Sequence, residues 1–297
     1  MATFLLIIVT MVWGSTFFLI KDLVATVPAT DFLAVRFTIA AAVMALVFWR
    51  HLRALTRREV RVGVGLGAIY GVAQILQTIG LAHTDASVSG FITGSYVVLT
   101  PILAAVILRD RIPGRVWTAA FLAMAGIGVL SLRGFALGYG ELLTLVAAAI
   151  YALHIIGLGR YASVHSAVGL ATMQAIVIAV VCVVASVPGG ITVPGTSGGW
   201  LSLLYMALIS GAFCLWAQTW AQAHLTAARA AIVMALEPVF AALFAVLFGG
   251  ESLTSRMLIG GSLVVSAMYL VELAPRRRPR ASAAQDPPVE ALHHEAP

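Results

Sequence analysis

Ionisable side chains stand out in this chain because they lie within long apolar stretches. Glu237 lies well inside one such stretch and is followed by Pro238, and Arg36 lies inside another. Charged groups within membrane helices are costly and usually face the bundle interior. Glu237 is therefore expected to titrate protons or pair with a cation, or else to support a helix break at Pro238. Arg36 is expected to bind an anionic or zwitterionic group, to pair with Glu237, or to extend toward the interface.

Uncharged polar and aromatic side chains recur at helical spacing in the same kind of stretch. Examples are Tyr70, Gln74 and Gln77, then Thr93, Tyr96 and Thr100, and the pairs Trp13–Phe17, Tyr151–His154 and Gln218–Gln222. Such faces indicate either a polar cavity or interhelical hydrogen bonds. For His154 the two options are a proton carrier and a packed, hydrogen-bonded side chain. The predicted pathway consists of Trp13, Arg36, Tyr70, Gln74, Gln77, Tyr96, Tyr151, His154, Gln218 and Glu237, with Pro101 and Pro238 as hinges.

The composition determines which elements must position these side chains. Of the 297 residues, 61% are hydrophobic and 10% are charged, and the mean hydropathy is +1.01. Soluble proteins contain about 45–50% apolar and about 25% charged residues, so a soluble enzyme is excluded. A membrane-spanning helix needs roughly 20 mainly apolar residues. The fold class predicted is therefore all-α integral membrane protein, and the first apolar stretch is expected to be an uncleaved helix.

Turn residues and charges divide the chain into ten predicted transmembrane segments. They span approximately 3–20, 31–49, 62–82, 88–108, 115–132, 140–158, 168–187, 200–221, 229–248 and 256–273. The connections between these segments lie alternately on the two sides of the membrane. Of the 18 Lys and Arg residues, only Lys21, Arg133 and Arg256 lie on one side, Arg36 lies within a helix, and the others lie on the side of the termini. The positive-inside rule then predicts an inner (plasma) membrane protein with both termini cytoplasmic.

The two halves of the chain repeat each other. A shift of 141 positions aligns residues 63–132 with 204–273, so that Gln77 matches Gln218 and Tyr96 matches Glu237. Each unit then holds five helices, and an odd number requires the second unit to enter the membrane inverted. We therefore expect repeats at 1–137 and 138–273, followed by a disordered cytoplasmic tail at 274–297.

Three stretches resemble the EamA family of the drug/metabolite transporter superfamily. They are WGSTFFLIKDL from Trp13 with Arg36 after it, TGSYVVLTPILAAVILRDR from Thr93, and LEPVFAALFAVLFGGESL from Leu236. The resemblance implies a ten-helix bundle with cytoplasmic termini that exports or takes up small metabolites. Tyr96 stands where the second half has Glu237, and Pro101 is displaced by one turn from Pro238, so a role of the second-half Glu-Pro pair does not extend to the first half.

We expect a secondary transporter that works by alternating access, driven by protons or by exchange, with a passive channel or facilitator as the alternative. The sequence holds no G-x-x-x-x-G-K-[ST] motif, no H-E-x-x-H motif and no acidic metal motif within the apolar segments. ATP hydrolysis, a metal, a cofactor and an enzymatic role are therefore not expected.

The expected partners are a small-molecule substrate and the lipid bilayer. The membrane topology explains the basic residues, so nucleic acid is not expected as a partner. An oligomer is possible but not indicated. Asp110 and Glu251 are expected in surface or gating ion pairs beside Arg109, Arg111 and Arg256.

Overall fold

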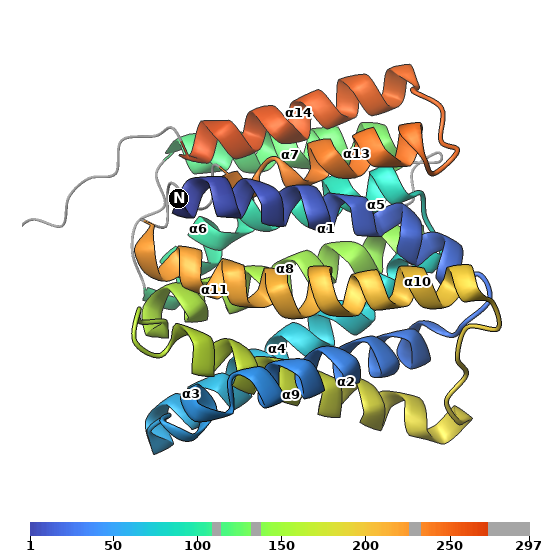
Figure 1. Cartoon of the computed structure of the whole chain (residues 1–297). Coiled ribbons are helices and arrows are strands. Elements are labelled where there is room, and N and C mark those ends of the chain that lie inside the picture. The colour runs from blue at the N-terminus through green and yellow to red at the C-terminus, as the bar shows by residue number, and fades with distance from the viewer. Residues whose placement is uncertain (109–113, 132–137, 226–232, 273–297) are drawn as a thin grey trace, which may run out of the picture.

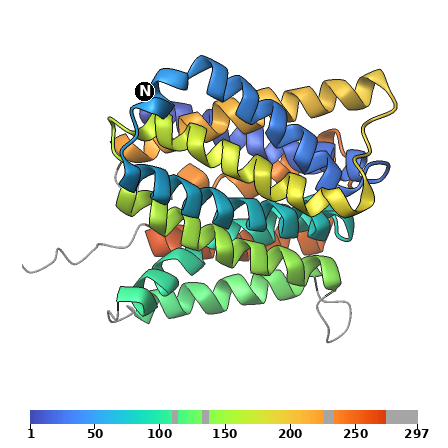
Figure 2. The same cartoon turned by 90° about the horizontal axis from the view of Figure 1, so that it is seen from below.

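The computed structural model describes residues 1–108, 114–131, 138–225 and 233–272, and these residues form helices and connections without a strand. The helices run side by side along one common direction (Figures 1 and 2). Their bounds are α1 Ala2–Val24, α2 Ala29–Val47, α3 Trp49–Arg53, α4 Arg57–Ala82, α5 Ala86–Gly94, α6 Tyr96–Leu108, α7 Gly114–Ser131, α8 Tyr139–Tyr161, α9 Ala167–Ser186, η1 Val187–Gly189, α10 Ser197–Tyr205, η2 Met206–Phe213, α11 Cys214–His224, α13 Glu237–Leu247 and α14 Ser255–Glu272.

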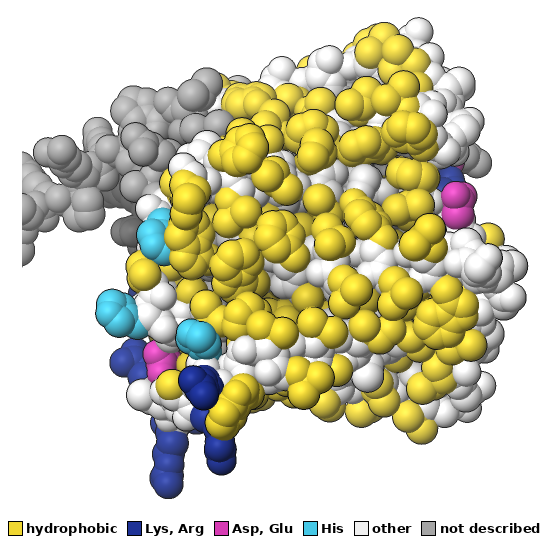
Figure 3. Space-filling model, in the orientation of Figure 1, with side chains coloured by type: hydrophobic (Ala, Val, Ile, Leu, Met, Phe, Trp, Pro, Cys, Tyr) yellow, Lys and Arg dark blue, Asp and Glu magenta, His cyan; other side chains and the backbone are white. Residues whose placement is uncertain are grey.

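The bundle has the dimensions and surface of a membrane protein. Among the described residues, seven helical stretches are long and apolar enough to cross a bilayer, and three shorter apolar helices accompany them. Large apolar side chains such as Phe121, Leu201 and Leu258 are exposed on the outside. Hydrophobic side chains cover most of the face seen in Figure 3, and charged ones gather at its two ends. The sequence-based prediction of an all-helical, multi-pass membrane protein is therefore confirmed.

The two ends of the bundle differ. The N-terminus, α3 and the connection from α8 to α9 lie at one end, which we call the amino-terminal end (Figure 1). The connections α1–α2, α9–α10 and α13–α14 lie at the opposite end, which we call the distal end. The basic residues of α3 and of the start of α4, from Arg50 to Arg61, all belong to the amino-terminal end.

Helices of the first part of the chain pack directly on helices of the second part. Helix α2 packs on α9, α7 on α14, and α4 on both α8 and α9, so each of these contacts joins residues before position 132 to residues after 137. Glycine allows the closest of these approaches. A Cβ atom at Gly67 would lie 2.8 Å from Cβ of Val177, and one at Gly63 would lie 2.7 Å from Cγ of Met173. The four-residue glycine spacing on α4 therefore forms a seam against α9.

Three predicted segments differ from the described helices. The segment predicted at 229–248 has a turn at residues 235–236 before α13, and its residues 229–232 lie outside the described residues. The segment predicted at 88–108 is divided at Ser95 into α5 and α6, and α6 continues through Pro101. The segment predicted at 200–221 contains the π-helix η2 between α10 and α11. The wide turn of η2 is stabilised from outside, because Trp13 Nε1 donates to the carbonyl of Ser210 at 3.1 Å and Arg36 Nε donates to the carbonyl of Met206 at 3.1 Å.

Candidate functional site

A cavity of about 50 Å³ lies between the helices, and side chains from both parts of the chain line it. Its lining residues are Trp13, Thr16, Phe17, Ile20, Arg36, Tyr70, Gln74, Gln77, Thr78, Leu81, Thr93, Tyr96, Tyr151, His154, Ile155, Gln218, Met234 and Glu237. All ten residues of the predicted pathway are therefore brought together around one space. Their positions agree with a shared site, while their roles remain predictions.

Arg36 is buried, with 3% of its surface exposed, and its guanidinium bonds to η2. Besides the Met206 carbonyl, its Nη2 donates to Ser210 Oγ at 2.9 Å. The rings of Phe32 and Phe37 lie 5.7 and 5.0 Å from the guanidinium carbon. Arg36 thus does not reach the interface. Within the described residues the hydrogen-bond partners of this buried guanidinium are neutral groups.

Glu237 is the acidic group of the cavity and begins α13. It is 6% exposed, and one carboxylate oxygen accepts from the Tyr96 hydroxyl at 2.9 Å. Glu237 and Arg36 line the same space, yet they form no ion pair with each other in the described structure. The described conformation thus shows no Arg36–Glu237 ion pair, and the pairing that the sequence offers as one option stays a prediction. Opposite charges are thus held apart around one cavity.

A hydrogen-bonded chain joins three helices on another wall. The Tyr151 hydroxyl donates to Gln77 Oε1 at 2.8 Å, and Gln77 Nε2 donates to Thr93 Oγ1 at 3.0 Å. The ring of Tyr70 packs edge-on against Tyr151 and His154, with centroid separations of 5.3 and 4.9 Å. These contacts fix the orientation of the aromatic wall by linking α4, α5 and α8.

His154 and Gln74 have their own partners. His154 is 1% exposed and shares a 2.8 Å hydrogen bond between Nε2 and Oε1 of Gln174 on α9. The amide of Gln174 also donates to the carbonyl of Leu170 at 3.2 Å, so this amide is well satisfied. Gln74 Nε2 makes a longer contact of 3.4 Å with the Tyr70 hydroxyl. His154 is thus a packed, hydrogen-bonded residue that still borders the cavity.

Gln218 differs from every other amide of the cavity. It is 2% exposed, and its Oε1 has no hydrogen-bond donor among the residues that the structure describes. A buried carbonyl oxygen without a donor costs about 1–3 kcal/mol. Gln218 lines the cavity, and its Oε1 atom is buried in the described conformation.

The two predicted hinge prolines occupy different environments. Pro238 lies in the first turn of α13, directly after a turn at residues 235–236, which places a helix break beside Glu237. Pro101 lies inside α6 and does not line the cavity. The break of the first part occurs instead at Ser95, whose Oγ donates to the carbonyl of Ile92 at 2.6 Å. The described backbone thus breaks near Pro238 but not at Pro101, and hinge function remains a prediction for both.

Several lining residues were not predicted to belong to the pathway. Phe17 and Thr93 share helical faces with Trp13 and Tyr96, so their spacing already carried the signal. Ile20, Leu81, Ile155 and Met234 are apolar, and nothing in an apolar segment distinguishes a lining side chain of this kind from a packed one. Within the described residues no group of three or more His, Cys, Asp or Glu side chains could hold a metal ion.

The expected ion pairs at the helix ends are only partly described. Asp110, Arg109 and Arg111 lie outside the described residues. Glu251 contacts the backbone at the start of α5, and Arg256 Nε donates to the carbonyl of Val129 at 3.0 Å.

Comparison with known proteins identifies the type of protein. The chain matches the EamA-like transporter family over residues 1–132 and 138–273. An uncharacterized transporter of Archaeoglobus fulgidus is 30% identical over 269 residues, which cover 90% of this chain and 84% of the relative. A protein of known crystal structure is similar in fold, with a TM-score of 0.65 at 18% identity over 91% of this chain and 96% of the other. The family and the relative indicate a membrane transporter rather than an enzyme, and the chain belongs to the EamA-like transporter family.

Proposed function

We propose that the protein is a secondary active transporter that moves a small solute by alternating access, with the central cavity as its binding site. The observation that carries the proposal is the convergence of polar side chains from both family-matched segments on one buried space. Arg36 and Gln77 come from the first segment, and Gln218 and Glu237 come from the second. A site at the interface of two repeats is typical of secondary transporters.

Ten transmembrane helices in two inverted repeats are part of this proposal. The packing supports it, because a contact between two helices recurs between the two helices that correspond to them in the other proposed half. Helices α2 and α9 occupy equivalent positions and pack together, as do α7 and α14. The contact of α4 with α8 corresponds to that of α11 with α1, and the contact of α1 with α13 corresponds to that of α8 with α6. Such a pattern is expected of a pseudo-two-fold axis between the halves.

The charges of the cavity support a class of solute. The buried Arg36 favours an anionic group, whereas Glu237 and the unpaired carbonyl of Gln218 favour an ammonium or another N–H or O–H donor. A small solute that carries both kinds of group would satisfy all three side chains at once. The cavity of about 50 Å³ has room for little more than a few water molecules. The described conformation therefore corresponds to a closed state, and the helices must separate to admit the solute.

Proton coupling or solute exchange would drive accumulation. Glu237 is the group that we propose for protonation, because it lines the cavity and its hydrogen-bond donor among the described residues is the neutral Tyr96 hydroxyl. We also propose that both termini lie in the cytoplasm and that the distal end faces outward. The basic residues around α3 at the amino-terminal end support this orientation.

Counterflow in proteoliposomes tests the proposal. Vesicles loaded with an unlabelled pool of amino acids, nucleosides or amphiphilic drugs would receive one labelled compound outside. Transient accumulation of label is expected for one compound class, and Arg36→Met should abolish it. Glu237→Gln should keep counterflow but lose accumulation driven by a pH gradient, whereas Glu141→Gln, outside the cavity, should keep both.

Each alternative gives a different result. Flux that neither saturates nor shows counterflow would identify a passive facilitator instead of a carrier. Retention of pH-driven accumulation in Glu237→Gln would assign Glu237 a structural role. Unchanged counterflow in Arg36→Met would contradict the proposed binding of an anionic group.

A further inference from the structure

A vestibule opens at the distal end of the bundle, directly beyond the central cavity. It encloses about 910 Å³ and is lined by charged side chains that include Lys21, Asp85, Glu141 and Glu251. On α1 the cavity lining ends at Ile20 and the vestibule lining begins at the next residue. The same is true on α4, where Leu81 lines the cavity and Ala82 lines the vestibule. One apolar layer therefore separates the two spaces on these helices.

Helices α5 and α13 close the remaining side of this barrier. A Cβ atom at Gly94 would lie 2.9 Å from Cγ of Pro238, and one at Gly90 would lie 2.5 Å from Cβ of Ala241. The two helices are thus in close contact from the level of the cavity toward the distal end. The next contact in that direction is made by Glu251, which follows α13 in the chain.

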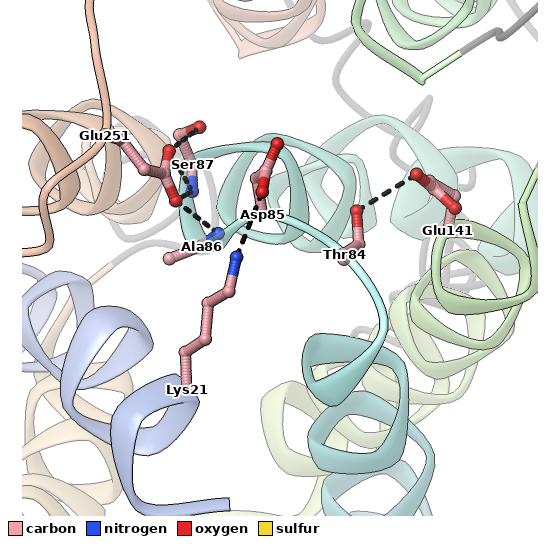
Figure 4. Close-up of polar contacts among 7 residues, drawn as sticks. All are labelled: Lys21, Thr84, Asp85, Ala86, Ser87, Glu141 and Glu251. Atoms are coloured by element: carbon pink, nitrogen blue, oxygen red, sulfur yellow. Dashed lines mark hydrogen bonds and ion pairs between the residues drawn. The ribbon is translucent and has the colours of Figure 1, made fainter. Parts of the chain in front are cut away.

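Glu251 caps α5 from a distant part of the sequence. Its carboxylate accepts from the backbone amide of Ala86 at 2.7 Å, from the amide of Ser87 at 3.4 Å and from the Ser87 hydroxyl (Figure 4). The first amides of a helix have no partner within the helix and favour a negative charge. Glu251 therefore holds the α13–α14 connection against the start of α5.

The residue that would normally cap α5 is occupied elsewhere. Asp85 is at the N-cap position, where aspartate is a preferred residue, yet its side chain makes no capping hydrogen bond. Instead Lys21 Nζ lies 3.0 Å from Asp85 Oδ1, and Figure 4 shows the lysine reaching it from α1. An N-cap side chain normally accepts from the second or third amide of the helix, so the Ser87 amide is within reach of both carboxylates, and Lys21 engages Asp85 instead.

We propose that Glu251 is the positioning residue of a distal gate that opens by an exchange of caps. In the closed gate Glu251 caps α5 and Lys21 retains Asp85. In the open gate Asp85 caps α5, Glu251 is released, and α5 and α13 separate. The movement reaches the binding site because α5 carries Thr93, which bonds to Gln77 in the cavity wall. The exchange leaves the Ser87 amide of α5 with a carboxylate partner in both states.

Side-specific labelling of a cysteine tests the gate without any transported solute, and it rests on the proposed function only for the orientation that places the distal end outside the cell. The reporter is Leu81→Cys in a background where the buried Cys182 and Cys214 are replaced by alanine. A membrane-impermeant maleimide is added to intact cells, and the reaction rate is compared with that of Ser252→Cys. Ser252 is exposed in the vestibule lining and reports access to the distal end itself.

Glu251→Gln is expected to raise the labelling rate of the reporter roughly fivefold to tenfold, the factor that loss of a helix cap produces. Lys21→Met should raise it as well, although it leaves every contact of Glu251 intact, because Asp85 is then free to compete. Adding Asp85→Ala to Lys21→Met should return the rate to that of the parent. Glu141→Gln is the matched control, since Glu141 lines the same vestibule but accepts from Thr84 rather than from α5, and its rate should not change.

Two results would overturn the proposal. The first is an unchanged rate in Lys21→Met, and the second is a raised rate that persists when Asp85→Ala is added, since neither fits a competition between two caps. If Glu251→Gln does not fold, as judged by its melting curve in detergent, the two Lys21 variants still decide between the outcomes.

Discussion

Replacement of Gln218 by methionine should stabilise the empty protein and weaken its binding of solute. Gln218 is buried on α11, and its carbonyl oxygen lacks a donor within the described structure. An unsatisfied buried acceptor costs about 1–3 kcal/mol, and methionine fills a similar volume without it. The free energy of unfolding should therefore rise by about 1–3 kcal/mol in Gln218→Met.

Gln174→Met is the matched control, because the same chemical change at a satisfied amide should have the opposite effect. Gln174 bonds to His154 at 2.8 Å and to the Leu170 carbonyl at 3.2 Å. Its loss would leave the buried imidazole without a partner and lower the free energy of unfolding by about 1–3 kcal/mol.

The assay compares both variants by denaturant unfolding in one detergent and by the KM of solute uptake. Loss of one neutral hydrogen bond to the solute should raise the KM of Gln218→Met about two- to tenfold. Two results would refute the reasoning. If Gln218→Met loses as much stability as Gln174→Met, the carbonyl of Gln218 has a partner in the folded protein. If the KM is unchanged, that carbonyl does not contact the solute.

Four further substitutions test the packing and the polar contacts. Gly67→Ala should lower the melting temperature, because its Cβ atom would lie 2.8 Å from α9. Gly65→Ala has open space around it and should raise the free energy of unfolding by about 0.5–1 kcal/mol. Equal effects of the two substitutions would contradict the glycine seam. Thr56→Ala removes a capping box at the start of α4 and should cost about 0.5–2 kcal/mol, measured by denaturant unfolding. Tyr96→Phe removes the hydroxyl that donates to Glu237 and should cost about 1–3 kcal/mol by the same measurement; an unchanged stability would mean that the carboxyl has another donor.

Ten lining residues of the central cavity could be predicted from the sequence for a simple physical reason. A polar side chain inside an apolar membrane helix must find a polar environment, and the bundle interior provides it. Tyr70, Gln74 and Gln77 follow one helical face, and all three line the cavity. Gln218 and Glu237 belong to the second part of the chain, were predicted in the same way and also line the cavity.

The partners of these side chains could not be predicted, because they depend on the register between helices. Arg36 was expected to bind an anionic or zwitterionic group, to pair with Glu237 or to reach the interface, and its guanidinium bonds to a carbonyl of the π-helix η2. Composition does not reveal a π-turn within an apolar segment. Glu251 likewise contacts backbone amides at Ala86, far away in the sequence. No local pattern in either stretch encodes that contact.

The π-turn of η2 has a consequence for how the cavity could change its chemistry. A π-turn accommodates an extra residue relative to an α-helical turn. If η2 tightened to α-helical geometry, the chain beyond it would rotate about its own axis by one residue, or about 100°. Gln218, which follows η2 on α11, would then leave its present place in the cavity lining, while α10 kept its place. The lining of the cavity would thus change by rotation of one half-helix about its own axis.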